Sequence, residues 1–551
     1  MRVTSFFFVV TSVLLSFTSS AQKAKSIIIN NGIDRPKLVV GIVVDQMRWD
    51  FLYRYYDRYS EGGFKRLLKK GFSFENTMIP YSPPVTSAGH TCLFTGSVPA
   101  IHGIVANDWV ERSTGDTMYC SQDETVQTVG SFSTTGHMSP RNMLTTTIGD
   151  ELRLATNFKS RVFGIALKDR GGIFAAGHSA NAAYWLDDST GNWISSTYYM
   201  NALPRWVQNF NAEKRPDEIL RKPWNRFYDS ASYTQSVANE IPFERSTPAQ
   251  VSKGFPHRYT TNGGRNYFGL RVSPFGNTFT LDFAKQLIEN EHLGSSGQTD
   301  MLCLSLSSTD YVAHRVGPQA SEVEDTYLRL DKDLGEFFLM LDKTVGQGNY
   351  FLFLSADHGA PQTPDYLNAN KMPGGSIRGK ALLVEINAEL FKKYKVKNLV
   401  RKYYEYQFYF DEHKIDSSGL ESGDVHDYAV KLLLQRPEIV QAFDYRNFYK
   451  TILQPDLKKR LLNSYFYKRS GDIQLIPKPQ YTDASTLGTD HGVGYTYDTH
   501  IPLLMYGWGI KPGKTNRETF MTDVAPTIAA MLRIQMPNGS VGHVLEEAVR
   551  K

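Results

Sequence analysis

The amino-acid sequence predicts an α/β fold with a mostly parallel central sheet and helices on both of its faces. Four short apolar runs, bounded by polar or glycine-containing segments, indicate buried strands at residues 38–44, 161–167, 301–306 and 350–355. Amphipathic patterns lie between them, and the clearest is at residues 322–341, where apolar residues recur at spacings of three and four. Strands that alternate with such helices are typical of a parallel sheet covered on both faces.

Two stretches interrupt this alternation. Residues 179–276 are rich in Asn, Tyr, Trp and Pro, and residues 387–479 are charged and partly helical. We expect both to be insertions that form a cap. The chain then returns to the core pattern with a strand at residues 501–506 and an apolar helix at residues 523–532, so the core is expected to be discontinuous in sequence.

The N-terminus has the pattern of a cleaved signal peptide at residues 1–21. Arg2 precedes an apolar run at residues 6–17, and the small residues Ser19, Ser20 and Ala21 follow it. The run is shorter than the roughly 20 apolar residues of a membrane span, so a membrane anchor is the less favoured alternative. We therefore expect a periplasmic or secreted protein, without a stable membrane anchor, whose residues 22–551 form a single domain.

Charge and cysteine content exclude some classes of protein. The formal net charge of +5, from 61 basic and 56 acidic residues, is too small to indicate binding to nucleic acid. Three cysteines, Cys92, Cys120 and Cys303, allow at most one disulfide, and none has the CxxC spacing of a metal site. Cys303 lies inside an apolar run and is expected to be buried.

Polar side chains follow each of the four predicted strands. Ligands gather at the carboxyl ends of the strands in an open parallel sheet, so these positions are candidates for a functional site. A single aspartate there is often only a helix cap, but Asp or His follows three of the strands. The residues are Asp45 after the first strand, Lys168 and Arg170 after the second, Asp310 and His314 after the third, and Asp357 and His358 after the fourth.

The Asp and His residues of this set suggest a site for two zinc ions. Imidazole and carboxylate together suit Zn²⁺ in a site without cysteine, and two metals roughly 4 Å apart can bind the attacking and leaving oxygens of a phosphoryl transfer. His491, in a glycine-bracketed loop, is the best candidate for a sixth ligand, with His500 and Asp490 as lesser candidates. The spacing alone leaves Mn²⁺ or Fe open in place of zinc.

Thr86 is a candidate nucleophile. Pro83 and Pro84 indicate an extended approach to Thr86, which is expected to begin a helix, where free backbone N–H groups favour an anion. A hydroxyl bound to Zn²⁺ loses its proton readily and needs no histidine base. A purely structural N-cap is the alternative role of Thr86, and Ser82, Ser87 and Thr91 are alternative nucleophiles at this point.

Several motifs together resemble a known family. From about residue 35 to about residue 542, the chain is similar to the phosphate-irrepressible, PafA-like alkaline phosphatases of bacteria, within the alkaline phosphatase superfamily. The motifs are VDQMRWD at 44–50, PVTSAGH at 84–90, ANDW at 106–109, KDR at 168–170, STDYVAH at 308–314 and SADHG at 355–359.

The resemblance implies a catalytic domain of the alkaline-phosphatase type and a role for each site residue. One Zn²⁺ would be held by Asp310, His314 and His491, and the second by Asp45, Asp357 and His358 together with Thr86. Asn107, Lys168 and Arg170 would contact the non-bridging phosphate oxygens. The implied reaction is metal-dependent hydrolysis of small phosphate monoesters through a phosphothreonine intermediate, with release of inorganic phosphate and an alcohol. We expect a monomer.

Three rival functions use similar residues. A nucleotide pyrophosphatase/phosphodiesterase would share the two-zinc site and the threonine, but a diester carries one fewer charged oxygen, so Lys168 and Arg170 favour a monoester. A sulfatase needs a Cys or Ser modification motif, which residues 85–89 lack. A phosphate- or zinc-binding scavenger would use the same ligands without turnover.

Overall fold

The computed structural model describes residues 33–237, 244–245, 251, 253–259, 267–484 and 487–549. The predicted signal peptide, residues 1–21, lies outside them. Residues Pro36–Lys551 form one compact unit, and the fold described below is that of this unit. Among the described helices, none combines the length and the apolar composition needed to cross a bilayer.

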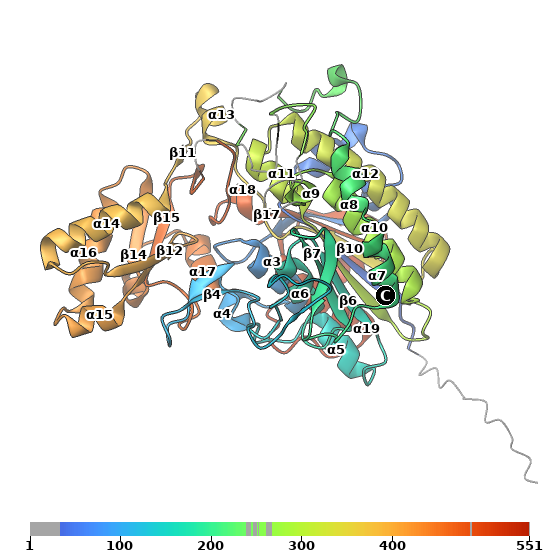
Figure 1. Ribbon diagram of the computed structural model, residues 1–551, viewed down its shortest axis with the longest axis horizontal. Coiled ribbons are helices and arrows are strands. Elements are labelled where there is room, and N and C mark those ends of the chain that lie inside the picture. The colour runs from blue at the N-terminus through green and yellow to red at the C-terminus, as the bar shows by residue number, and fades with distance from the viewer. Residues whose placement is uncertain are drawn as a thin grey trace, which may run out of the picture. The chain divides into compact units, whose positions relative to one another are not determined.

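A mixed sheet forms the centre of the fold (Figure 1). Its five central strands, β10, β1, β9, β6 and β7, run parallel to one another, whereas β17 is antiparallel to β10 and β8 is antiparallel to β7. Across the sheet the order is β18 (Gly513–Thr515), β2 (Phe72–Met78), β17 (His500–Gly507), β10 (Tyr350–Ser355), β1 (Leu38–Val44), β9 (Asp300–Leu306), β6 (Val162–Ala166), β7 (Ala182–Asp187), β8 (Asn192–Ser196) and β5 (Thr128–Val129), with β19 (Thr519–Phe520) beside β2.

The predicted α/β fold is confirmed. Strands β1 and β10 have the predicted bounds, and β6 and β9 differ from the predicted ranges only at their ends. All residues of these four strands are buried. Strands of a parallel sheet are covered on both faces, so both sides of each strand are apolar. Their sequences are therefore continuous apolar runs rather than alternating apolar and polar residues.

Helices pack in two groups on the two faces of the sheet (Figure 1). Within each group the helices contact one another, and the predicted helix at residues 322–341 belongs to the first group as α12. The first group is α10 (Phe275–Asn290), α11 (Ser308–Val316) and α12 (Ser321–Leu341), and the second is α3 (Thr86–Thr95), α5 (Ile148–Ala155), α6 (Asp169–Ala176) and α19 (Val524–Leu532).

A second, smaller sheet lies within residues 375–484, which we call the inserted subdomain (orange in Figure 1). Its antiparallel strands are β12 (Val400–Tyr404), β13 (Gln407–Phe410), β15 (Ile473–Pro477) and β14 (Ile439–Asp444), and it includes α14 (Gly379–Tyr394) and α16 (Ser422–Leu434). These elements share a hydrophobic cluster of their own. The inserted subdomain is therefore longer than the predicted insertion at 387–479, because it begins before residue 387 and includes the whole of α14.

The predicted insertion at 179–276 needs a correction, because β7 and β8 fall inside it and still extend the central sheet. The buried side chains of Tyr184, Trp185 and Trp193 pack in these strands, and the two strands form an antiparallel pair rather than a strand–helix–strand unit. Strands β7 and β8 are rich in aromatic residues and are joined as a hairpin without a helix between them. For these two reasons the sequence did not show the strand–helix alternation of the core. The described part that follows, including α7 (Arg205–Ala212), lies outside the sheet.

The three cysteines are free and buried, as predicted for Cys303.

Gly164 on β6 provides a test of this packing. A Cβ atom at Gly164 would lie 2.2 Å from the carbonyl oxygen of Gly172 on α6. We expect Gly164→Ala to destabilise the protein by about 1–3 kcal/mol through overpacking. The control is Gly423→Ala in α16, where an added Cβ meets no described atom within 4 Å and helix propensity predicts a gain of up to about 1 kcal/mol. Equal thermal unfolding midpoints for the two variants would contradict the close helix–sheet contact.

Candidate active site

The predicted ligands meet at one edge of the central sheet. Strands β10, β1, β9 and β6 are adjacent and parallel, so the residues after their carboxyl ends lie together. His491 reaches the same edge from the loop that precedes β17, because β17 runs antiparallel to β10 and Leu503 near its start pairs with Ser355 at the end of β10.

Asp45, Asp357 and His358 form the first cluster. The Nε2 atom of His358 lies 3.5 Å from Oδ1 of Asp45 and 3.6 Å from Oδ2 of Asp357. All three side chains are fully buried, and these three atoms have no hydrogen-bond partner among the described residues. Buried polar atoms are rarely left unpaired, so three unpaired ligand atoms within 4.8 Å of one another fit a bound metal ion.

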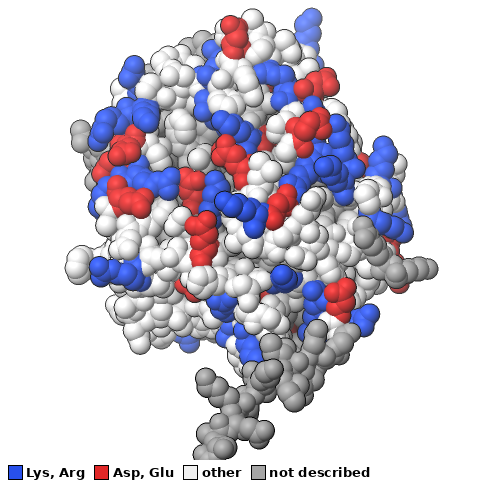
Figure 2. Space-filling view, turned by 90° about the vertical axis from the view of Figure 1, so that its right-hand side faces the viewer, with Lys and Arg blue, Asp and Glu red and all other residues white. Residues whose placement is uncertain are grey.

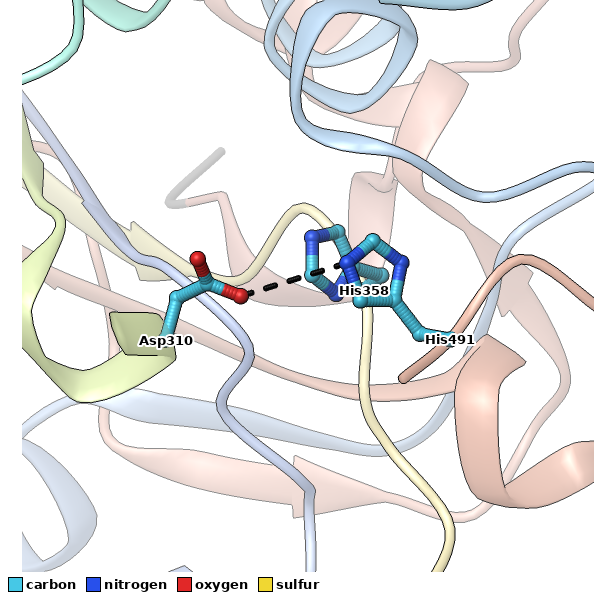
Figure 3. A group of neighbouring side chains, drawn as sticks. All are labelled: Asp310, His358 and His491. Atoms are coloured by element: carbon cyan, nitrogen blue, oxygen red, sulfur yellow. Dashed lines mark ion pairs between the residues drawn. The ribbon is translucent and has the colours of Figure 1, made fainter. Parts of the chain in front are cut away.

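Asp310, His314 and His491 lie beside the first cluster, and we call these three residues the second cluster. Oδ1 of Asp310 lies 3.1 Å from Nε2 of His314 and 3.9 Å from Nε2 of His491. Figure 3 shows His491 facing Asp310, with its ring stacked on that of His358, and the ring centroids are 3.5 Å apart. Asp490, the lesser candidate, lies near His314 and His491, and its side chain is 39% exposed.

The three histidines share one orientation. A backbone carbonyl oxygen can only accept a hydrogen bond, so a ring nitrogen beside it carries the proton and the other nitrogen keeps its lone pair for a metal. In each histidine the nitrogen beside the carbonyl is Nδ1, which leaves Nε2 as the ligand atom. The carbonyls are those of Thr489 for His314 at 2.9 Å, Gly359 for His358 at 3.1 Å and Pro84 for His491 at 2.9 Å.

The electrostatics of the site reflect three carboxylates held away from water. Burial raises the pKa of Asp45 well above its usual range, and the neighbouring Asp357 raises it further. Burial opposes ionisation of Asp310 as well, but His314 and Lys168 bring the pKa of Asp310 well below its usual range. Burial also lowers the pKa of His491 well below its usual value. A neutral imidazole beside carboxylates is the form in which these groups bind a metal.

Thr86 is the first residue of α3, as predicted, and lines a cavity of about 340 Å³ together with Asp310, His314 and His491 of the second cluster. Its hydroxyl accepts a hydrogen bond from Nζ of Lys168 at 3.2 Å. The competing hydroxyls are occupied by backbone carbonyls: Ser87 donates to Ala106 at 2.8 Å, and Thr91 donates to the carbonyl of Ser87 at 2.7 Å. Ser82 lines a different cavity. The helix start is therefore confirmed, and among these hydroxyls Thr86 has the most favourable position.

Lys168 is buried between the two clusters. Its ammonium group donates to Oδ2 of Asp45 and Oδ2 of Asp310, each at 2.6 Å, and lies 5.0 Å from the centre of the Tyr311 ring. Burial alone would lower the pKa of Lys168, but Asp310 and Asp45 raise it well above the usual value. Lys168 thus stays charged and contacts one carboxylate of each cluster.

Asn107 and Arg170 line the same cavity, and neighbouring groups orient their side chains. Oδ1 of Asn107 accepts a hydrogen bond from the backbone N–H of Ser87 at 3.2 Å, which leaves its amide nitrogen available. Arg170 donates to the hydroxyl of Tyr119 at 3.0 Å, and this hydroxyl donates to Asp169 at 3.0 Å. The cavity therefore contains one amide and two cationic donors beside Thr86.

Comparisons with known proteins identify the family. The family model described as type I phosphodiesterase / nucleotide pyrophosphatase matches residues 39–501. Alkaline phosphatase PhoV of Synechococcus elongatus is 46% identical over 98% of this chain and 98% of its own length. A protein of Myroides odoratus named calcium-transporting ATPase is 48% identical over 96% of this chain and 97% of its own length. The crystal structure of wild-type alkaline phosphatase PafA matches with a TM-score of 0.90 and 46% identity, over 94% of this chain and 100% of that one. The chain belongs to the PafA-like alkaline phosphatases.

Membership of the PafA-like alkaline phosphatases confirms the resemblance, the fold class and the enzyme class that the sequence predicts. The superfamily also implies metal cofactors, and the described residues include three groups of candidate ligands: Asp45, Asp357 and His358; Asp310, His358 and His491; and His314, Asp490 and His491. His500, the other candidate histidine, lies elsewhere: it stacks on Trp49, and its Nε2 is 2.9 Å from the carbonyl oxygen of Glu75.

In this PafA-like alkaline phosphatase, three residues make contacts at the site that were not anticipated from the sequence. The backbone N–H of Gln46 donates to Asp357 at 3.1 Å, and the side-chain amide of Gln46 donates to Asp310 at 2.6 Å. His90, one helical turn after Thr86, lies 3.4 Å from Asp357. Gly89 packs so closely that a Cβ there would be 2.5 Å from Cβ of Asp357. Only the position of Gln46 directly after Asp45 could have indicated a role for it.

Proposed function

We propose that the protein is a metal-dependent phosphate monoester hydrolase in which Thr86 is the nucleophile. The observation that carries the proposal is the position of the Thr86 hydroxyl, 3.2 Å from the Lys168 ammonium, in a cavity that is also lined by the carboxylate and imidazole groups of the second cluster. A nucleophile, cationic donors and ligand atoms for metal ions are the parts that phosphoryl transfer requires.

Two Zn²⁺ ions are the proposed cofactors. Asp310, His314 and His491 would hold one, and Asp45, Asp357 and His358 would hold the other together with Thr86. The support is the unpaired, buried ligand atoms of the first cluster and the shared orientation of the three histidines. When bound, the metals supply Lewis acidity that lowers the pKa of a coordinated hydroxyl and stabilises charge on a leaving oxygen.

The chain's own residues provide the nucleophile and position the substrate. Thr86 Oγ1 attacks phosphorus as the bond to the alcohol oxygen breaks, which gives a phosphothreonine and the free alcohol. Water then attacks phosphorus, and Thr86 is released together with inorganic phosphate. Two displacements predict net retention of configuration at phosphorus. Lys168, Arg170 and the amide of Asn107 donate to the non-bridging oxygens, over which the transferring group spreads its negative charge.

A relative supports the choice of these four residues. A second solved structure of alkaline phosphatase PafA, 45% identical with a TM-score of 0.91, carries substitutions of a threonine, an asparagine, a lysine and an arginine. Thr86, Asn107, Lys168 and Arg170 are the same residue types in the same chain order, and in this protein they line one cavity. The phosphodiesterase alternative is not favoured, because the cations of Lys168 and Arg170 suit the greater charge of a monoester.

The proposed partners are small phosphate monoesters. On the face shown in Figure 2, acidic and basic side chains are interspersed, without a continuous basic patch, in keeping with the small net charge of +5. A surface of this kind lacks the basic patch that proteins use to bind the phosphate backbone of nucleic acid. We propose a monomer that acts in the periplasm or outside the cell, as the signal-peptide pattern indicates.

Replacing Thr86 tests the nucleophile. Thr86→Ala should lower kcat/KM for p-nitrophenyl phosphate by about 1,000-fold or more because no phosphothreonine can form. Metal content should stay unchanged because the first cluster keeps its three protein ligands, Asp45, Asp357 and His358. The matched control is Ser87→Ala, which removes a neighbouring hydroxyl that bonds to Ala106 and should change activity only a few-fold. Full activity in Thr86→Ala would disprove the assignment.

Removing the two cations tests the preference for monoesters. In the double variant Lys168→Ala, Arg170→Ala, kcat/KM should fall about 100-fold more for p-nitrophenyl phosphate than for its bis-ester, because the monoester carries the extra charged oxygen. Lys402→Ala, an exposed residue of β12 outside the cavity, is the control and should leave both rates unchanged. Equal losses on the two substrates would contradict the proposed role of Lys168 and Arg170.

Metal stoichiometry tests the assignment of His491 as a ligand. His491→Ala should lower the zinc content, measured by plasma mass spectrometry, from about two ions per chain to about one, because a site that loses one of three protein ligands binds its metal far more weakly. His500→Ala, which removes a histidine outside both clusters, should retain two. Two bound ions in His491→Ala would instead point to Asp490 as the ligand beside His314.

A further inference from the structure

The residues that line the reaction cavity fall into two chemically different sets, which we call its two halves. One half contains Thr86 with the donors proposed to bind phosphate. The other half is formed by the inserted subdomain and the two loops beside it. Its described lining includes the carboxylates of Asp108, Glu405, Asp483 and Asp490 and the rings of Tyr403 and Tyr406. No step of the proposed reaction uses these groups.

Glu405 is held at the cavity by an unusual turn. Glu405 and Tyr406 connect β12 to β13, and both have left-handed backbone conformations, with φ of 46° and 62°. Two-residue hairpin turns of this kind strongly favour Asn and Gly. The Tyr406 hydroxyl accepts from the backbone N–H of Asp483 at 3.1 Å and donates to the carbonyl of His491 at 3.5 Å. The turn is therefore tied to the metal-ligand loop, and Glu405 lies at the cavity wall.

The carboxylates of this half are close enough to influence one another. Burial together with Asp490 and Asp483 raises the pKa of Glu405 to about 8, and burial together with Asp490 raises the pKa of Asp483 to about 6. Lys380 is the basic residue that the inserted subdomain adds to the described lining, and it is exposed. At alkaline pH this half of the cavity is therefore net negative.

Tyr403 adds an unsatisfied group to the same half. Its side chain is 6% exposed, and its hydroxyl is buried without a hydrogen-bond partner among the described residues. The Tyr403 ring lines the cavity together with Tyr406. Aromatic rings beside carboxylates form the environment that attracts an organic ammonium group, through cation–π and Coulombic interactions.

We propose that this half binds the alcohol portion of the substrate and selects phosphate monoesters of cationic amino alcohols over those of anionic alcohols. The inference rests on the proposed function, since it needs the phosphate to lie beside Thr86, Lys168 and Arg170. A dianionic phosphate then faces the cationic half, and an ammonium group faces Glu405 and the tyrosine rings. A carboxylate on the alcohol would face Glu405, Asp483 and Asp490 and be repelled.

Three substrates of similar size test the proposal at pH 9.5, where Glu405 is ionised. They are choline phosphate, its neutral isostere 3,3-dimethylbutyl phosphate, and an ω-carboxyalkyl phosphate of similar length. Because the alcohols differ in intrinsic leaving ability, the quantity compared is the change in the kcat/KM ratios between zinc-loaded wild-type protein and Glu405→Gln. The control is Glu389→Gln, which removes an exposed carboxylate of α14 outside the cavity.

In Glu405→Gln, the cationic-to-neutral ratio should fall by about 3- to 10-fold, and the anionic-to-neutral ratio should rise by a similar factor, as expected when one partly screened unit charge is removed. Raised ionic strength should shrink both differences. Glu389→Gln should leave the ratios unchanged. Unchanged ratios in Glu405→Gln, with the neutral ester still hydrolysed, would overturn the inference.

Three further outcomes remain distinguishable. If wild-type protein does not hydrolyse the neutral ester, the proposed function fails rather than this inference. If Glu405→Gln does not fold, Asp483→Asn provides the same comparison, with activity on the neutral ester as the check of folding. A third metal equivalent that is present in wild-type protein and lost in Glu405→Gln would show that this half binds a metal cation, and would overturn the inference.

Discussion

Parallel pairing of β10, β1, β9 and β6 is the constraint on which the site depends. Each strand ends at the same edge of the sheet, and each is followed within a few residues by a charged or imidazole group. Residues more than 300 positions apart in the chain, such as Asp45 and Asp357, thereby come within one cluster. The antiparallel β17 adds His491 at that edge, because it begins where β10 ends. The directions of the strands, rather than any one side chain, bring the residues of the site together.

This assembly concentrates negative charge in a dry environment. Three buried aspartates lie at the strand ends, and the buried Lys168 contacts only two of them. Burial of several carboxylates is costly unless they are paired with cations or bind metals. The raised pKa of Asp45 and the unpaired atoms of the first cluster have the same cause. The chain's own cations compensate part of the charge, and the remainder fits the divalent ions that we propose.

The strands and the strand-end residues were predictable because their signals are local: an apolar run followed by a polar residue. Thr86 at a helix start was predictable for the same reason. The strands β7 and β8, the contacts of Gln46 and the approach of Glu405 to the cavity depend on long-range packing and on left-handed backbone conformations that the sequence does not reveal. The roles assigned to the site residues stay predictions.

The contact between Gly89 and Asp357 has a consequence for redesign of the enzyme. Since α3 lies against the end of β10 through main-chain atoms, the spacing between residue 86 and the first cluster is independent of side-chain rotamers. Another nucleophile placed at position 86, such as serine or cysteine, would start from the same Cα position relative to Asp357. Differences in rate between such variants would then reflect the chemistry of the attacking atom, because the position of residue 86 would change little.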